Sequence, residues 1–184
     1  MRRLLVAVGA LVSALVLGGG GFIVTRAPNL GAVGDGQVES KQKSAVFTIA
    51  DRTIRQVRYD DRATMRYTFT LRNDAWYDVK VNGLKAEKVE QTLLKVKGLT
   101  DVEGHSSFSL ESGEERRVVL AVQMTDCERL SARASSLIES VRLRVTGLAG
   151  MDHEIALQLP EELRTGSARE MFCPFATAKS RPPG

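Results

Sequence analysis

The feature that most constrains the fold is a strict alternation of apolar and polar side chains between Thr64 and Arg72. Every second residue is large and apolar, namely Met65, Tyr67, Phe69 and Leu71. A period of two places these side chains on one face of a β-strand and the polar ones on the other. The segment therefore predicts a strand with one face in a core and one face in water.

Similar alternation recurs along the chain between residues that favour turns. Asn73-Asp74, Asn82-Gly83 and Pro160 are expected to end strands. The clearer strands are expected at 76–81, 116–124, 137–148 and 155–159, and weaker ones at 45–49, 53–58, 92–96 and 107–110. About seven to nine short strands at this spacing predict an all-β, antiparallel β-sandwich.

The N-terminus carries a long apolar run. Arg2 and Arg3 precede a stretch from Leu4 to Val24 that contains no charged residue. About 20 apolar residues suffice for a helix to cross the hydrocarbon core of a membrane. We favour an uncleaved signal anchor over residues 1–26, with the arginines in the cytoplasm and the rest of the chain outside the cell membrane.

Cleavage of this segment is the alternative. Thr25-Arg26-Ala27 resembles a signal-peptidase site, but Pro28 follows it directly, and a cut within Gly18–Gly21 also remains open. No cysteine follows the run, which excludes a lipoprotein anchor. A buried helix of a soluble protein is a poorer interpretation, because an apolar run that starts at residue 4 behind arginines is rarely part of a core.

Composition divides the rest of the chain. Residues 27–43 are rich in Gly, Ser and Gln and predict a flexible stalk. The alternating segments place the β-sandwich domain at 44–173, and residues 174–184 predict a disordered tail.

The two cysteines are Cys127 and Cys173. Two cysteines in an oxidising compartment predict one disulfide. A redox or metal pair is disfavoured, because the spacing is not C-x-x-C and no histidine is near either cysteine in sequence.

The charge balance argues against a nucleic-acid partner. The net charge is +4, and two of the 26 basic residues, Arg2 and Arg3, belong to the targeting segment. The other basic residues alternate with acids and form no cluster in the sequence, whereas nucleic-acid binding requires a basic face.

Three segments resemble a known class of domains. The stretch from Phe69 to Val81 looks like a hairpin of bacterial immunoglobulin-like extracytoplasmic domains. The turn at 110–114 resembles one of the same class, with Ser112 where proline is usual. The segment 157–160 together with Cys173-Pro174 is similar to the ending of uncharacterised membrane-anchored proteins of actinobacteria. Over residues 45–174, the resemblance implies an immunoglobulin-like fold in the cell envelope and no catalytic residues.

Few residues suggest chemistry. His153 with nearby methionines suggests a copper site, but Met65 and Met124 fall on inward strand faces, where methionine usually fills a core. Ser106, His153 and Asp152 have the residue types of a catalytic triad, but no G-x-S-x-G motif accompanies them. We therefore expect no enzyme activity.

Loop acids and one aromatic residue complete the candidates. Asp60-Asp61 and Asp101 with Glu103 have calcium-ligand chemistry without an EF-hand pattern, so we interpret them as solvated turn acids and expect no metal or cofactor. Trp76 should point away from the core, because Tyr77 shares the parity of the inward valines. Trp76 is either a binding anchor or, in the interpretation we prefer, a cover over the end of the sandwich.

Three functions follow from these observations. The first is a non-catalytic binding module of the cell envelope, tethered to the membrane and contacting a protein partner that the sequence does not identify. The second is an accessory subunit of a membrane complex, in which Gly19 and Gly20 pack closely against another helix. The third is a secreted carrier of a small molecule or copper.

Overall fold

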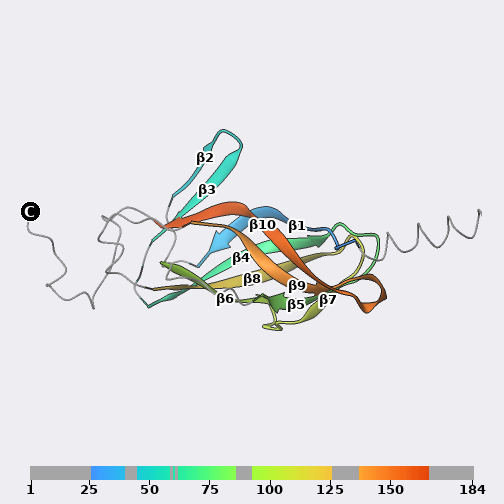
Figure 1. The fold of residues 1–184 in the computed structure, drawn as a ribbon. Helices are drawn as coiled ribbons and strands as arrows, with labels where there is room; N and C mark the ends of the chain where they lie inside the picture. The colour runs from blue at the N-terminus through green and yellow to red at the C-terminus, as the bar shows by residue number, and fades with distance from the viewer. Residues whose placement is uncertain are drawn as a thin grey trace, which may run out of the picture.

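The computed structural model describes residues 26–39, 45–58, 60, 62–85, 93–125 and 137–165. These residues form two β-sheets that pack face to face, so the predicted all-β sandwich is confirmed (Figure 1). The anchor helix expected within residues 1–26 and the tail at 174–184 lie outside the described residues, apart from Arg26.

One sheet has four strands in the order β1-β4-β8-β6. Every neighbouring pair in it is antiparallel. Its strands are β1 (Leu30–Val38), β4 (Thr64–Asn73), β8 (Glu115–Met124) and β6 (Leu94–Asp101).

The second sheet has six strands in the order β2-β3-β10-β9-β5-β7. Strands β10 and β3 pair in parallel, which departs from the antiparallel prediction, while the other pairs are antiparallel. A short 3₁₀ turn, η2 (Leu148–Gly150), connects β9 to β10. The strands are β2 (Val46–Ile49), β3 (Arg52–Val57), β10 (Asp152–Thr165), β9 (Leu137–Thr146), β5 (Val79–Leu84) and β7 (Phe108–Leu110).

The core lies between the sheets and is built from the predicted inward positions. In β4 the four alternating apolar side chains are at most 2% exposed. Burial of large apolar side chains provides the main driving force for such a sandwich. The facing positions of β8 and β9 are equally buried, namely Val118, Leu120, Val122, Met124, Val141, Leu143 and Val145.

The predicted stalk at 27–43 is wrong for most of its length, because Leu30–Val38 forms strand β1. Pro28 is already buried, and Asp74 donates a backbone hydrogen bond to the carbonyl of Asn29 at 3.0 Å. The glycines that suggested a linker have a structural reason. A Cβ at Gly36 would lie 2.0 Å from Tyr67 Oη, so only glycine allows β1 to cross this ring.

Two predicted strand ends are also wrong. Asn82 and Gly83 lie inside β5, where the register shifts between Val81 and Leu84 and Gly83 takes a φ of +93°. A glycine at positive φ accommodates such a bulge. Pro160 does not end β10, because the register with β9 shifts between Gln158 and Leu163 and the strand continues to Thr165. Proline is tolerated where a ladder is interrupted.

Candidate functional site

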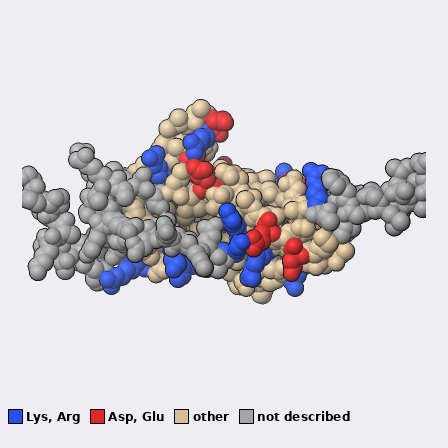
Figure 2. All heavy atoms as spheres, in the orientation of Figure 1, with Lys and Arg blue, Asp and Glu red and all other residues tan. Residues whose placement is uncertain are grey.

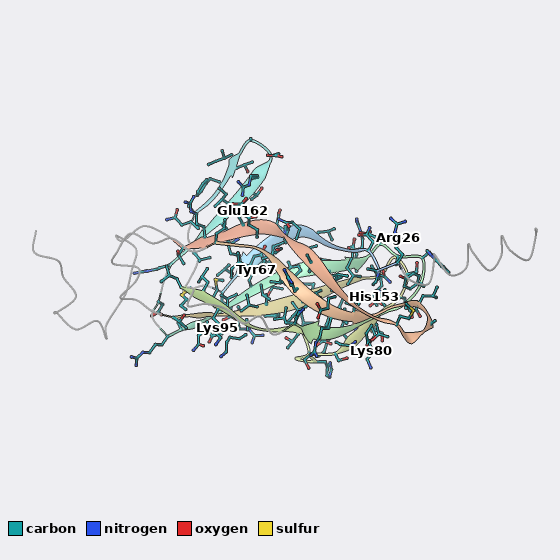
Figure 3. All side chains as sticks on the ribbon, viewed as in Figure 1. Arg26, Tyr67, Lys80, Lys95, His153 and Glu162 are labelled. Carbon is teal, nitrogen blue, oxygen red and sulfur yellow. The ribbon has the colours of Figure 1, made fainter. Side chains whose placement is uncertain are left out.

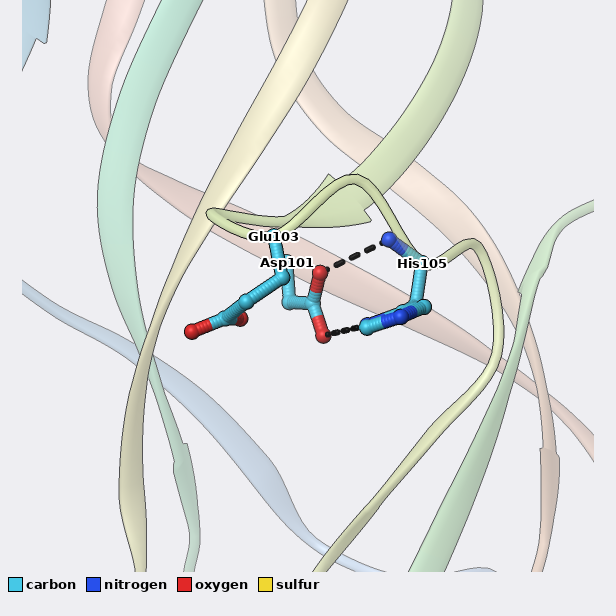
Figure 4. Close-up of side chains that lie close together, drawn as sticks. All are labelled: Asp101, Glu103 and His105. Atoms are coloured by element: carbon cyan, nitrogen blue, oxygen red, sulfur yellow. Dashed lines mark hydrogen bonds and ion pairs between the residues drawn. The ribbon is translucent and has the colours of Figure 1, made fainter.

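The turn after β6 brings three polar side chains together (Figure 4). Ligand atoms of Asp101, Glu103 and His105 all lie within 4.8 Å of one another. Asp101 is only 3% exposed, so it is not the solvated acid that we expected. Its two carboxylate oxygens lie 2.8 Å from the backbone nitrogen of His105 and 2.9 Å from His105 Nδ1.

These contacts identify the turn as a hydrogen-bonded unit. Burial is the largest influence on the pKa of Asp101 and would raise it, but hydrogen bonds from the His105 side chain and backbone together lower the pKa. Both oxygens of Asp101 already have partners within the turn. The hydrogen bonds within the turn therefore account for the positions of these side chains. The spacing of Asp101 and His105 in the sequence did not predict that they would be in contact.

A second polar group lines an open depression of about 470 Å³ beside β9 and β10. Asn82 donates to Thr146 Oγ1 at 2.7 Å, and that hydroxyl donates to Asp152 at 2.7 Å. Asp152 and His153 both line this depression, but Asp152 accepts from Thr146, and the buried Nε2 of His153 has no partner among the described residues. The triad considered from the sequence therefore does not have the required geometry.

Two of the methionines considered for a copper site with His153, Met65 and Met124, lie far from it, whereas Met151 is two residues away in the sequence. Met124 pairs with Leu94 next to Lys95, whereas His153 pairs with Val145 near the other end of the sandwich (Figure 3). Met65 and Met124 are fully buried, in agreement with a core role. His153 Nε2 is itself buried and finds no hydrogen-bond partner among the described residues.

The end of the sandwich near His153 is also where the described chain begins. Tyr77 donates a hydrogen bond from its hydroxyl to the carbonyl of Arg26, at 3.5 Å. Trp76 contacts the Tyr77 ring edge-on, with centroids 5.2 Å apart, and remains 68% exposed. Trp76 is exposed, as predicted, but it does not cover the end of the sandwich as we preferred. The strand expected at 76–81 begins only at Val79, and residues 75–77 form a bend, so the strand parity used to place Trp76 does not apply.

Hydrogen bonds of Asn73 and Ser112 fix the loop that carries Trp76. Asn73 is fully buried, and its side-chain amide donates to the carbonyls of Tyr77, Leu110 and Glu111 at 2.8, 3.1 and 3.0 Å. Its side-chain oxygen accepts from the backbone of Ala75, which forms the turn that Asn73-Asp74 predicted. The hydroxyl of Ser112 donates to the carbonyl of Ala75 at 2.8 Å, so the exposed indole stands on a fixed loop.

Strands β2 and β3 form a hairpin that projects from the body of the sandwich (Figure 1). Strand β2 is the edge of its sheet, and all four of its residues are exposed. Val46, Phe47 and Ile49 are 47%, 37% and 58% exposed. Figure 2 shows residues other than Lys, Arg, Asp and Glu over the outer part of this projection, and acidic and basic residues are also present on it.

A buried ion pair fixes the base of this hairpin. Arg55 of β3 contacts Glu161 of β10 through two hydrogen bonds of 2.5 and 2.8 Å, and also donates to the carbonyl of Gly36 at 2.6 Å. Tyr67 donates to Glu161 at 3.3 Å from the other sheet. The hydrogen bond that Arg55 donates to Glu161 raises the pKa of Arg55, and burial followed by the charge of Glu161 raises the pKa of Tyr67.

The sequence analysis missed this pair, although a signal was present. Leu157, Leu159 and Leu163 alternate on the inward face of β10, and Glu161 occupies the position between them. A carboxylate at an inward position requires a buried partner. The alternation along the strand therefore indicated a salt bridge at Glu161. It was not predicted because the strand was expected to end at Pro160, one residue earlier.

Four candidate residues lie outside the described part of the chain: Cys127, Cys173, Gly19 and Gly20. The disulfide and the helix-packing face therefore remain predictions. Within the described residues, no helix has the length and apolar character needed to span a membrane. Comparisons of the sequence with protein-family models and with curated proteins find no match.

Proposed function

We propose that this protein is a non-catalytic interaction module of the cell envelope, tethered by its N-terminal segment and binding a protein partner through the β2–β3 hairpin. The edge strand β2, which has no second partner strand among the described residues, is the observation that carries this proposal. Residues 45–50 contain no charged side chain, and three of them are exposed large apolar residues. Natural proteins usually protect such an edge with charges, proline or a covering segment.

The expected partner is an extended polypeptide that adds a strand to this edge. Gln56 donates a backbone hydrogen bond to the carbonyl of Ala45 at 2.8 Å. Because antiparallel pairs alternate, the backbone groups of Ala45 and Phe47 face β3, whereas those of Val46 and Thr48 face the free edge. Strand addition uses main-chain hydrogen bonds for affinity and the exposed side chains for specificity.

An immunoglobulin-like relationship to bacterial extracytoplasmic domains belongs to the same proposal. The two-sheet sandwich supports it, and the parallel pairing of β10 with β3 is a departure from a purely antiparallel sandwich. The apolar run from Leu4 to Val24 supports the membrane tether.

The test uses Thr48, whose backbone N–H faces the free edge. Thr48→Pro removes that donor and leaves the β2–β3 hydrogen bonds in place, whereas the control Thr48→Val keeps the donor. Tagged full-length variants would be crosslinked in their own membranes and the captured proteins quantified by mass spectrometry. We expect one abundant partner with the wild type and Thr48→Val and its loss with Thr48→Pro. Equal capture by both variants would exclude strand addition at β2.

A further inference from the structure

The described chain begins at one end of the sandwich and is fixed there. Pro28 is buried and β1 begins at Leu30. A Cβ built at Gly147 would lie 3.5 Å from atoms of both Tyr77 and His153 and 3.6 Å from Pro28, so these residues converge at this end. No free stalk separates the folded domain from residue 26.

The number of residues before this point limits the distance to the membrane. The uncharged run ends at Val24, two residues before Arg26. An extended chain spans about 3.5 Å per residue, so Arg26 lies within about 7 Å of the end of the run. The headgroup layer of one leaflet is about 5–8 Å thick. If the run crosses a bilayer, this end of the sandwich must therefore reach the headgroups.

The side chains at this end suit such a position. Trp76 is 68% exposed beside Tyr77, and tryptophan and tyrosine concentrate at membrane–water interfaces, where one part of the ring system is buried and the other is wet. The loop is fixed by Asn73 and Ser112, so exposure of the indole does not depend on a flexible loop.

The charged residues near Trp76 do not favour binding to lipids of one particular headgroup charge. Arg26 and Asp78 are exposed, and Asp74 pairs with Arg72 at 2.6 Å. Without a cluster of cations among these described residues, attraction to anionic headgroups is not required.

The geometry points to a phospholipid seat: the end of the sandwich that carries Arg26, Trp76 and Tyr77 rests in the headgroup layer, with Trp76 as its interfacial anchor. This inference rests on the membrane tether of the proposed function. It gives the domain a defined orientation. The β2–β3 hairpin projects from the half remote from Arg26 and is held away from the bilayer (Figures 1 and 3).

The single tryptophan of the chain makes the seat directly measurable. The full-length protein would be reconstituted in phosphatidylcholine vesicles with bromine atoms near the top of the acyl chains. We expect brominated lipid to reduce the emission of Trp76 and the bilayer to protect it from aqueous acrylamide. In a control variant that combines Trp76→Phe and Phe47→Trp, the tryptophan lies in the hairpin. Its emission should not be reduced by brominated lipid and should be quenched by acrylamide.

Flotation of the same vesicles separates the two ways of failing. If the protein floats with the vesicles but bromine leaves Trp76 emission unchanged, the seat is wrong while the tether stands. If the protein does not float, the tether and the seat are both wrong. Quenching that requires added phosphatidylglycerol would overturn the role of Trp76, because a charge interaction would then hold the domain to the membrane.

Discussion

The ring of Tyr67 leaves no space for a side chain at position 36 of β1. A Cβ there would lie 2.0 Å from the hydroxyl oxygen of Tyr67 and 2.3 Å from two of its ring carbons. The same hydroxyl donates to Glu161, so the ring cannot rotate away without losing a buried hydrogen bond. Gly36 is thus a packing requirement at the contact between the sheets, although the sequence suggested a linker.

Gly36→Ala should therefore destabilise the fold by about 1–3 kcal/mol, the usual cost of overpacking a core. Urea denaturation of the purified chain would measure this loss in the free energy of unfolding. Gly98→Ala is the matched control, because a Cβ at Gly98 in β6 would meet no atom within 4 Å. Equal midpoints for the two variants would contradict the contact between Gly36 and Tyr67.

The lowered pKa of Asp101 predicts the direction in which stability changes with pH. Its pKa is lowered on folding, so its contribution to stability is present above the pKa of the unfolded carboxyl and is lost as pH falls through the folded pKa. His105→Ala removes the ring donor but keeps the backbone donor, so the pKa of Asp101 should rise part of the way to its ordinary value. An NMR titration of the Asp101 carboxyl would detect this. An unchanged titration would exclude the ring contact.

At the scale of elements, the strands with long alternation were predictable and the irregular ones were not. Strand β4 has ten residues and β8 has ten, and both carry one buried face that sets their register. Strand β1 contains Gly31, Gly34 and Gly36 and shows no alternation. Pairing with β4 holds β1 in place, and that tertiary contact is not visible in a local pattern.

The candidate sites were also only partly predictable from the sequence. The exposure of Trp76 was predicted from strand parity, but Trp76 lies in a bend before β5, so parity is not the reason for its exposure. The cluster around Asp101 depends on the shape of a turn, and the projection of the β2–β3 hairpin depends on the whole sheet. Neither follows from residue spacing. The ion pair of Arg55 and Glu161 joins residues that are 106 positions apart, and it could be inferred only for Glu161, from its parity.

Arg55 and Glu161, with their hydrogen bonds to Gly36 and Tyr67, link four strands, so loss of this ion pair should affect the sandwich as a whole. The Glu161 side chain is 5% exposed and that of Arg55 is 13% exposed. Removing one partner of a buried pair leaves an unpaired charge, so Glu161→Gln should reduce the free energy of unfolding by about 3 kcal/mol. Thermal and urea unfolding would measure the change.

Glu139→Gln provides the control for that experiment. Glu139 also pairs with an arginine of β3, Arg52, but the two side chains are 45% and 55% exposed. Exposed pairs contribute little, so the change should stay within about 0.5 kcal/mol. A similar loss in both variants would show that burial of the Arg55 pair does not determine its contribution.

At the scale of the whole molecule, two regions are expected to contact different partners. The region around Arg26 and Trp76 lies where the chain leaves the N-terminal segment, and the β2–β3 hairpin projects from the remote half (Figures 1 and 3). Both contacts depend on the absence of a stalk, because a domain held directly on the bilayer keeps one orientation relative to it. A long flexible linker would allow either region to contact either partner.

Photo-crosslinking from two positions tests this polarity most directly. A photoreactive phenylalanine analogue would replace Phe47 in one full-length variant and Trp76 in another, each illuminated in its own membranes. We expect a discrete crosslinked protein from position 47 and crosslinked phospholipid from position 76. Lipid adducts from position 47, or a protein adduct without lipid from position 76, would contradict this expectation.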